Sequence, residues 1–498
     1  MNANYAAFLD KYREIARLDE IASLLSWDQE TCMPRGAIRD RADQSAVLAS
    51  LLHRKATDPA YAGLVAELSL DDSLSPEEKI QVREARRDLD KAVKIPPSLV
   101  ETLSKTSSLA QEAWVRSRAQ NDYGLFKGYL EKLIGLKKQE AACLGFEKNP
   151  YAAFLDDYEP GMTEEKLEAV FKPLKETLPA LVRKAAAGSV KFRKDLFTRS
   201  FPVSRQETLN HFISEEMGIP ADRSRMDVSA HPFCSSSSMN DVRRTVRYND
   251  HFPFRSLYAA MHEGGHALYD LNLHPCLACT PCGRAVSLGV HESQSRLWEN
   301  VIGRSRAFFK AYFPRMRSIF APCLDDATED DLYALSNEVA PSFIRVEADE
   351  ATYNLHIILR FDIERAIFSG RLAVDDLPGA WNAAFEQYLG IKVDTLGNGM
   401  LQDVHWSLAS FGYFPTYTLG NLIAAQLKYA LEKQLGPIRE IIEKRRLGEV
   451  RNWLNENIHR HGRLKNAEEI VRDSTGGPLN PGFFDQYLRE KYGELYGF

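Results

Sequence analysis

Hydrophobic residues recur at intervals of three and four along most of this chain, the spacing that gathers side chains on one face of an α-helix. Between residues 5 and 25 the repeat runs through Phe8, Ile15, Leu18 and Ile21. The same spacing predicts helices at 77–93, 110–143, 163–187, 204–217, 328–369, 419–446 and 482–496. The chain is therefore predicted to be mainly α-helical.

Two short stretches show the composition and alternation expected of β-strands. They are VRRTVRY at 242–248 and AVSLGV at 285–290, on either side of the segment AAMHEGGHALYD at 259–270. No internal repeat, low-complexity tract or Gly/Ser linker divides the sequence. We expect residues 1–498 to form one unit, mainly helical, with a small sheet beside the 259–270 helix.

The composition narrows the classes of function. Hydrophobic residues make up 44% of the chain and charged residues 27%, and the net charge of -6 provides no basic footprint for nucleic acid. The first residues are charged where a signal peptide needs an apolar run, and no segment reaches the roughly 18 apolar residues of a membrane span. Seven cysteines are few and odd in number, unlike a secreted disulfide framework. These features predict a cytoplasmic protein that binds neither nucleic acid nor membranes.

The segment at 259–270 carries a candidate zinc site. His262 and His266 are four residues apart, so both imidazoles can lie on one face of a helix and bind one ion. Glu263 lies about 100° around the helix, where it can take a proton from a water activated by the metal and pass it to a leaving amine. Gly264 and Gly265 would allow another segment or a substrate to approach closely. The alternative is a partly buried helix whose histidines are hydrogen-bonded.

A catalytic zinc needs a third protein ligand and one open position. Glu292, 26 residues after His266, is the candidate, in the first turn of a predicted helix. His291 is its rival, although adjacent side chains point apart. Alternatively, Glu292 is an acid favoured by the helix dipole. Asp270 and Glu299 are candidates to accept a hydrogen bond from a ligating histidine.

Seven short motifs in a fixed order extend this pattern over nearly the whole chain. They are LLSWDQETCMP at 24–34, HPF at 231–233, DVRRT at 241–245, the 262–266 helix, HESQ at 291–294, IRVEAD at 344–349 and GMLQDVHW at 399–406. Together they resemble the thermostable metallocarboxypeptidases of the carboxypeptidase Taq type.

This resemblance implies a fold, a metal and a reaction. The fold would be two helical lobes around a deep groove with the metal at its floor, usually in a homodimer. His262, His266 and Glu292 would bind zinc, for which cobalt can substitute, and Glu263 would act as general base. The substrates would be peptides, shortened by one C-terminal amino acid at a time with broad side-chain tolerance.

A carboxypeptidase must recognise a terminal carboxylate, which an arginine can bind in a bidentate manner. Arg345 is the family-matched candidate, at the start of a predicted long helix. Its alternative is a solvated helix face with an Arg345–Asp349 pair worth ~0.3 kcal/mol. Arg243 is a second substrate-binding candidate, on a strand expected to lie at the sheet edge and hold an extended peptide. Its charge would otherwise protect that edge.

The tetrahedral intermediate of peptide hydrolysis needs a donor to its oxyanion. By similarity to related peptidases we favour Tyr417 over Tyr413, with His405 and His231 contacting substrate carbonyls. Either tyrosine would otherwise be a core residue with a satisfied hydroxyl.

A run of three cysteines, Cys276, Cys279 and Cys282, precedes Glu292. With His274 they would make a second metal or iron–sulfur site, but the family does not ordinarily carry cysteines here. A turn with reduced thiols is the favoured interpretation.

Two further functions compete with a metallocarboxypeptidase. An oligoendopeptidase would use the same metal chemistry without reading the terminal carboxylate. A non-catalytic peptide-binding scaffold would have no need of Glu263 between two ligands, which argues against it.

Overall fold

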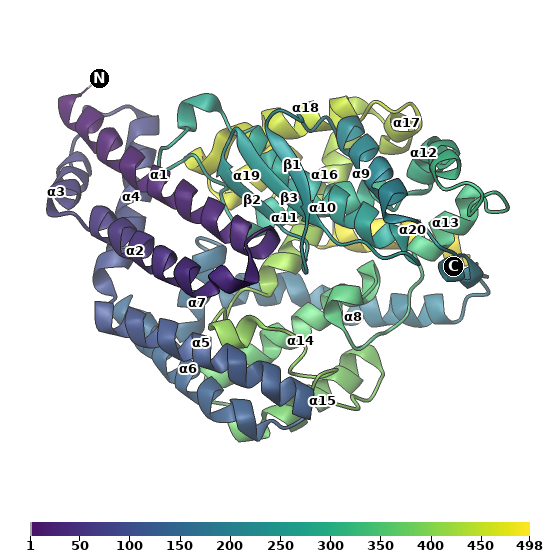
Figure 1. Ribbon diagram of the computed structural model, residues 1–498, viewed down its shortest axis with the longest axis horizontal. Coiled ribbons are helices and arrows are strands. Elements are labelled where there is room, and N and C mark those ends of the chain that lie inside the picture. Colours follow the sequence, from purple (N-terminus) through teal and green to yellow (C-terminus); the bar gives the residue numbers. More distant parts are fainter. Residues whose placement is uncertain (1) are drawn as a thin grey trace.

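A computed structural model describes residues 2–498 (Figure 1). Four helices form the N-terminal part: α1 (Ala3–Thr31), α2 (Ile38–Ala56), α3 (Pro59–Leu68) and α4 (Pro76–Lys94). Five more lead to the sheet: α5 (Pro97–Gln120), α6 (Gly124–Cys143), α7 (Pro150–Tyr158), α8 (Glu164–Ala186) and α9 (Val203–Met217). The strands are β1 (Ser224–Val228), β2 (Cys234–Ser238) and β3 (Asp241–Val246). The mainly helical fold with a small sheet is confirmed.

Eleven helices follow the sheet. They are α10 (Pro253–Leu271), α11 (Leu288–Arg296), α12 (Arg306–Ile319), α13 (Glu329–Ser336), α14 (Glu350–Phe368), α15 (Leu377–Leu389), α16 (Pro415–Leu435), α17 (Ile438–Glu443), α18 (Leu447–Asn457), α19 (Ala467–Thr475) and α20 (Gly482–Tyr496). A π-helix, Leu297–Gly303, continues α11 without a break. Such wide turns are frequent at functional sites.

Three predicted helices are interrupted. The 110–143 stretch is divided between α5 and α6 because Asn121 adopts a left-handed φ of 54°. The 419–446 stretch is divided at Gly436–Pro437, between α16 and α17. The 328–369 stretch holds α13 and α14 with an irregular connection in which Arg345 begins a short 3-10 turn. Asp349 is the N-cap of α14, and its side chain accepts hydrogen bonds from the backbone N–H groups of residues 351 and 352.

The predicted strand at 285–290 is wrong. Helix α11 begins inside it at Leu288, where the Ser287 hydroxyl accepts a hydrogen bond from the Val290 backbone and caps the helix. Glu292 consequently lies in the second helical turn and not in the first. The serine cap outweighs the β-propensity of the valines in this stretch.

The predicted strand at 242–248 is confirmed as β3, but its predicted place at the sheet edge is wrong. The strand order is β1-β3-β2, so β3 is central, parallel to β1 and antiparallel to β2. Arg244 of this strand is also buried. It is 3% exposed, and its guanidinium donates to the Ser214 hydroxyl at 3.0 Å.

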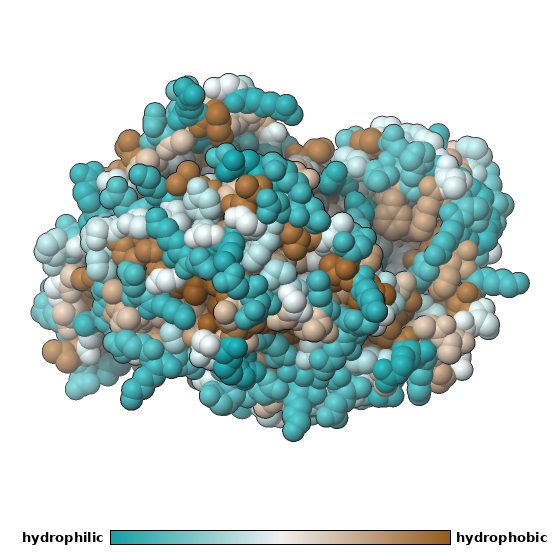
Figure 2. Space-filling view, turned by 90° about the horizontal axis from the view of Figure 1, so that it is seen from below, coloured by the Kyte–Doolittle hydropathy of each residue, from teal (hydrophilic) through white to brown (hydrophobic). Residues whose placement is uncertain are grey.

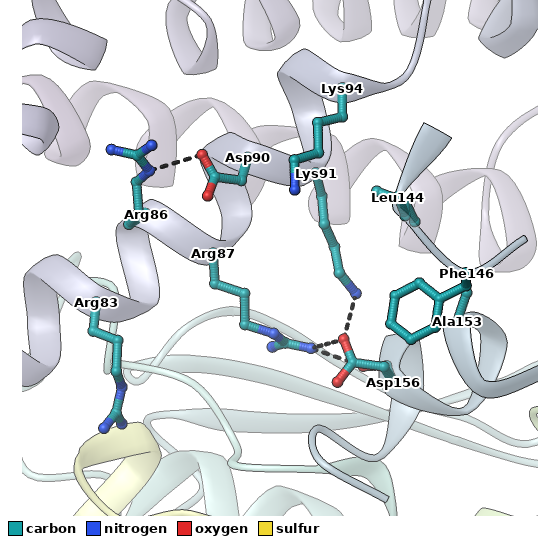
Figure 3. A pocket seen from close by; sticks show the side chains of 10 residues that line it. All are labelled: Arg83, Arg86, Arg87, Asp90, Lys91, Lys94, Leu144, Phe146, Ala153 and Asp156. Carbon is teal, nitrogen blue, oxygen red and sulfur yellow. Dashed lines mark hydrogen bonds and ion pairs between the residues drawn. The ribbon is translucent and has the colours of Figure 1, made fainter. Parts of the chain in front are cut away.

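Buried apolar side chains form two separate clusters. A small cluster joins α1, α3 and α4, and a large one fills the remainder of the molecule. Polar contacts line the seam between them: Arg87 and Lys91 of α4 converge on Asp156 of α7 at 2.9 and 3.0 Å (Figure 3). The N-terminal helices therefore form a lobe with a core of its own.

The face seen from below is mostly hydrophilic, with small scattered hydrophobic groups (Figure 2). None of the helices within residues 2–498 is sufficiently long and apolar to cross a membrane.

Candidate metal centre

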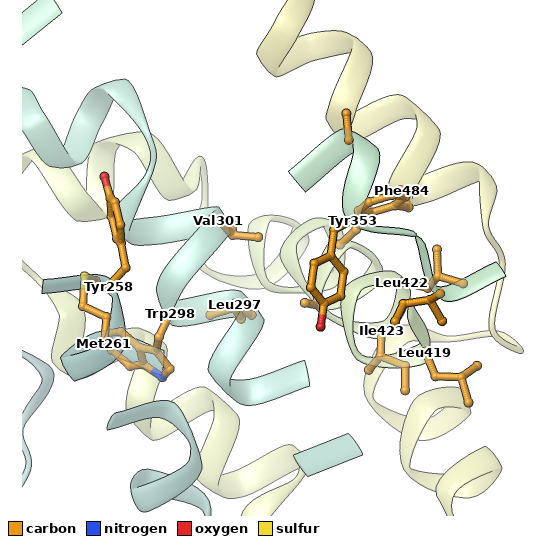
Figure 4. Close-up of a cluster of buried hydrophobic side chains, with 14 of the residues drawn as sticks. Tyr258, Met261, Leu297, Trp298, Val301, Tyr353, Leu419, Leu422, Ile423 and Phe484 are labelled. Atoms are coloured by element: carbon orange, nitrogen blue, oxygen red, sulfur yellow. The ribbon is translucent and has the colours of Figure 1, made fainter. Parts of the chain in front are cut away.

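Helix α10 presents two histidines on one face and a hydrophobic surface on the other. The ring centroids of His262 and His266 lie 5.0 Å apart, and their side chains remain 19% and 15% exposed. On the opposite face Leu257 and Met261 are fully buried. Met261 lies near Trp298 of the π-helix in the main core (Figure 4). The buried face anchors the helix and leaves the histidines accessible.

A close helix crossing brings the third carboxylate to these histidines. A Cβ on Gly265 would lie 2.5 Å from the Gln294 carbonyl oxygen and 2.6 Å from the Ser295 Cα. The glycine at 265 is therefore required because the α11 backbone passes directly over it. From the other side Gly420 of α16 approaches the Glu292 side chain so closely that a Cβ would lie 2.4 Å from its Cγ. Glu292 is held between two helices.

The three side chains offer a ligand set for one ion. One ligand atom from each of His262, His266 and Glu292 lies within 4.8 Å of the others. Oε2 of Glu292 is 3.5 Å from Nε2 of His262 and 3.2 Å from Nε2 of His266. Zinc bonds of roughly 2.0–2.2 Å at tetrahedral angles separate neighbouring ligand atoms by about 3.3–3.6 Å. The donor types are those of a tetrahedral zinc site, and of the two separations 3.5 Å lies within this range and 3.2 Å just below it.

The charges around the site affect the three side chains differently: burial lowers the pKa of His262, but the Glu292 and Glu299 carboxylates outweigh it and raise that pKa above its usual value. Burial and the neighbouring His291 lower the pKa of His266 to about 4, so its ring is neutral. Burial would raise the pKa of Glu292, but Arg296 and the histidines hold it well below its usual value. Arg296 Nε is 2.6 Å from Oε1 of Glu292, which leaves Oε2 for the histidine side.

Glu299 orients the first histidine. Its Oε2 lies 2.8 Å from Nδ1 of His262, so the imidazole donates there and its Nε2 lone pair is free for a metal. Arg304 donates to the other carboxylate oxygen at 2.8 Å. The expected partner role of Glu299 thus has the required geometry, whereas Asp270 contacts His291 at 3.2 Å instead of a ligand.

Glu263, between the two histidines, is 6% exposed. Burial raises its pKa to about 7, with neighbouring carboxylates adding to the effect against the pull of His262. A carboxyl group with a pKa near neutrality can exchange protons in both directions, which is the property needed in a general acid–base catalyst.

Arg345 belongs to a buried cluster of charges. Its Nε and Nη2 donate to Oδ1 of Asp403 at 3.0 and 2.9 Å, and Nη1 donates to the Tyr353 hydroxyl at 2.8 Å. Arg360, fully buried, donates to the other Asp403 oxygen at 2.7 Å. Two guanidinium groups therefore share one carboxylate. The alternative interpretation of Arg345, a solvated helix face, is wrong, since Arg345 is 4% exposed.

The three aromatic candidates after this cluster lie together. The Tyr417 hydroxyl is 3.5 Å from Nε2 of His405, and the ring of Tyr413 is 5.4 Å from that of Tyr417. The Arg345 guanidinium lies 4.9 Å from the Tyr417 ring centre. Burial raises the pKa of both tyrosines, and the Glu292 carboxylate adds to the effect in each, so both phenols remain protonated donors.

The remaining two candidates, His231 and Arg243, lie beside and within the sheet. His231 is exposed in the connection from β1 to β2, where its carbonyl accepts from the Ser229 hydroxyl at 2.6 Å. Arg243 forms a bidentate pair with Asp241 and lies 4.3 Å above the Trp27 ring of α1. Within the described residues no hydrogen bond or ion pair joins either side chain to the three ligand residues.

The cysteines point to different neighbours. Cys276 Sγ lies 2.8 Å from Nδ1 of His274, Cys279 Sγ faces Glu20 at 3.6 Å, and Cys282 is buried. All three thiols are free.

Asp403 and Arg296 are two of the charged residues at this site to which sequence reasoning assigned no role; Arg304 and Arg360 are the others. Asp403 stands two residues before His405 inside GMLQDVHW, and only that motif hinted at it. Arg296 follows Glu292 by one helical turn, a spacing typical of an ordinary surface pair. An aspartate or an arginine in a sequence does not by itself indicate that the residue is buried against a charged partner.

Comparison with known proteins gives consistent matches over the full length. The sequence model of the family described as carboxypeptidase Taq (M32) metallopeptidase matches residues 7–492. The chain is 36% identical to carboxypeptidase 1 of Bacillus subtilis, over 98% of each protein. It is 37% identical to thermostable carboxypeptidase 1 of Pyrococcus furiosus, over 99% of each. The crystal structure of the M32 carboxypeptidase from Deinococcus radiodurans superimposes with a TM-score of 0.97 at 39% identity, covering 100% of both chains.

Proposed function

Because this chain belongs to the carboxypeptidase Taq (M32) metallopeptidase family, we propose that it is a zinc-dependent carboxypeptidase that releases single C-terminal amino acids from peptides with broad specificity. Its class, a metallocarboxypeptidase, follows from the metallopeptidase family that it belongs to and from full-length relatives named carboxypeptidase. The observation that supports the zinc-dependent mechanism is the convergence of His262, His266 and Glu292 beside Glu263.

The metal is assigned from the donor set. Two imidazoles, which bind a metal in their neutral form, and one carboxylate are ligands that zinc accepts in catalytic sites, with a fourth position open. Cobalt(II) accepts the same set, so it should substitute. A divalent cation held there supplies Lewis acidity that polarises the scissile carbonyl and acidifies a water.

Glu263 is proposed to move the proton. Its carboxylate takes the proton from the attacking water and delivers it to the departing amide nitrogen, which leaves as an amine. The pKa of about 7 allows both steps near neutral pH.

Arg345 is proposed to bind the C-terminal carboxylate. Arg345 and Arg360 together carry two positive charges against the single charge of Asp403, so the buried cluster has a surplus of one positive charge. A terminal carboxylate would neutralise that surplus, which a mid-chain peptide bond cannot do. The same preference distinguishes an exopeptidase from an oligoendopeptidase.

The other roles follow the resemblance. We propose Tyr417 as the donor to the oxyanion, with His405 beside it, and Tyr413, His231 and Arg243 as substrate contacts in a groove between the lobes. Tyr417 and His405 receive support from their contact. We also propose that residues 1–498 act as one catalytic domain in a cytoplasmic homodimer.

Timed mass spectrometry of a peptide with a blocked N-terminus tests the function. The free C-terminus should be trimmed one residue at a time, and chelation should stop the trimming until zinc or cobalt is restored. The same peptide with an amidated C-terminus should remain intact. Internal fragments from both peptides would overturn the carboxypeptidase assignment, and trimming that survives complete metal removal would overturn the metal mechanism.

A further inference from the structure

The two histidines of the metal centre have unlike surroundings. Nδ1 of His262 bonds to Glu299 at 2.8 Å. Nδ1 of His266 is buried and has no hydrogen-bond partner within residues 2–498. Instead, the ring of His266 lies against the ring of His291, with centroids 4.5 Å apart and planes within 22° of parallel. The second histidine therefore has a stacking neighbour where the first has a hydrogen-bond partner.

His291 is itself fixed on two sides. Its Nε2 lies 3.2 Å from Oδ1 of Asp270, and the ring of Tyr269 lies 5.2 Å away. The other oxygen of Asp270 accepts a hydrogen bond from the Ser236 hydroxyl of β2. Asp270 follows His266 by one turn of α10, so the same helix carries the ligand and the carboxylate that holds its stacking partner.

The Asp270 carboxylate depends on these two bonds for its position. A cavity of about 430 Å³ between α1 and the sheet is lined by Asp270, Ser236 and Glu20, so packing does not enclose the carboxylate on that side. Strand β2 is fixed by α1, because the Ser23 hydroxyl lies 2.9 Å from the Ser235 hydroxyl and donates to the Ser236 carbonyl at 3.2 Å. The position of Ser236 is thus set independently of the metal ligands.

We propose that Ser236, Asp270 and His291 are positioning residues that act in series to orient His266 for metal binding. Ser236 fixes Asp270, Asp270 fixes His291, and the His291 ring restricts rotation of the His266 ring. In this arrangement a stacked imidazole has the role that Glu299 has for His262 through a direct hydrogen bond. The proposal rests on the zinc ligand set given above.

The first experiment tests the ligand set alone, so that an error in the ligand assignment can be distinguished from an error in this proposal. The zinc-loaded wild-type protein should hold one ion per chain at this centre, and His266→Ala should lose it. If His266→Ala retained the ion, the ligand assignment and this proposal would both be wrong, whatever the outer residues do.

The series is then tested by the rate of zinc transfer to excess chelator and by the visible spectrum of the cobalt-substituted protein. Asp270→Asn should weaken metal binding by roughly 10–100-fold and shift the cobalt bands, because His291 loses its charged partner. Ser236→Ala should act in the same direction by less. The double variant should lose zinc no faster than Asp270→Asn alone, since Ser236 acts only through Asp270.

Ser238→Ala is the matched control. It lies in the same strand, and within residues 2–498 its hydroxyl accepts only from the Asn240 backbone at 3.2 Å, so zinc transfer should match that of the wild type. Ser236→Ala removes one hydroxyl and leaves every charge in place, so it keeps the test open if Asp270→Asn folds poorly. Unchanged zinc transfer and cobalt spectra in Asp270→Asn would refute the proposal. Multiplying effects in the double variant would refute the serial arrangement.

Discussion

Gly265→Ala should separate the metal ligands without touching any of them. The added Cβ would lie 2.5 Å from the Gln294 carbonyl oxygen, whereas ordinary contacts begin near 3.4 Å, so the α11 backbone must move by about 1 Å. The two nearest atoms, the Gln294 carbonyl oxygen and the Ser295 Cα, belong to the backbone and cannot rotate away. Glu292 would move with α11, and metal sites tolerate deviations of only about 0.2 Å in ligand distances.

The neighbouring glycine gives a matched control. Gly264→Ala meets Met217 Cε at 2.6 Å and Ile219 Cδ1 at 3.1 Å, which are side-chain ends that can rotate away. Both substitutions gain about 1 kcal/mol of helix propensity, but overpacking against backbone costs about 1–3 kcal/mol. Gly265→Ala should therefore be about 1–3 kcal/mol less stable to unfolding than Gly264→Ala.

Two assays check this prediction. Unfolding of the metal-free proteins should give the stability difference, and competition with a chromophoric chelator should show at least about 10-fold weaker zinc binding in Gly265→Ala alone. Equal stability and equal zinc affinity in the two variants would show that the helix crossing does not require glycine, and our explanation of residue 265 would be wrong.

Three further predictions concern charge. Glu263→Gln should keep one zinc per chain yet lower kcat by about 10²–10⁴-fold, measured by metal analysis and peptide hydrolysis. Arg345→Ala should lower kcat/KM for free C-termini by roughly 10–100-fold and leave Arg360 paired with Asp403; a loss due to misfolding would appear in the circular dichroism spectrum. Burial in α14 raises the pKa of Glu364 to about 7, so the folded protein binds this proton more tightly than the unfolded chain does. The resulting stabilisation of the fold is complete below about pH 4.5 and is lost as the pH rises towards 7. Relative to Glu364→Gln, the free energy of unfolding of the wild type should fall by on the order of 3 kcal/mol across that window, measured in denaturant at several pH values.

Local information in the sequence was sufficient to predict most of the helices and to propose the metal ligands. A helix period of 3.6 residues places His262 and His266 on one face whatever the surroundings, and the motif order pointed to Glu292. The prediction of secondary structure was wrong where a single capping residue outweighed the hydrophobic pattern around it. Ser287 ended the predicted strand at 285–290, and left-handed Asn121 divided a long helix.

The surroundings of the ligands were decided only in three dimensions. Sequence proposed Asp270 as a partner for a ligating histidine, but the fold turns its carboxylate to His291 and Ser236. Sequence placed β3 at an edge, whereas strand order put it in the centre. The reason is physical: periodicity fixes which side chains share a face, while the crossing of α10 and α11 at Gly265 fixes which of them meet. Contacts between residues far apart in the chain leave no periodic pattern in the sequence from which they could be predicted.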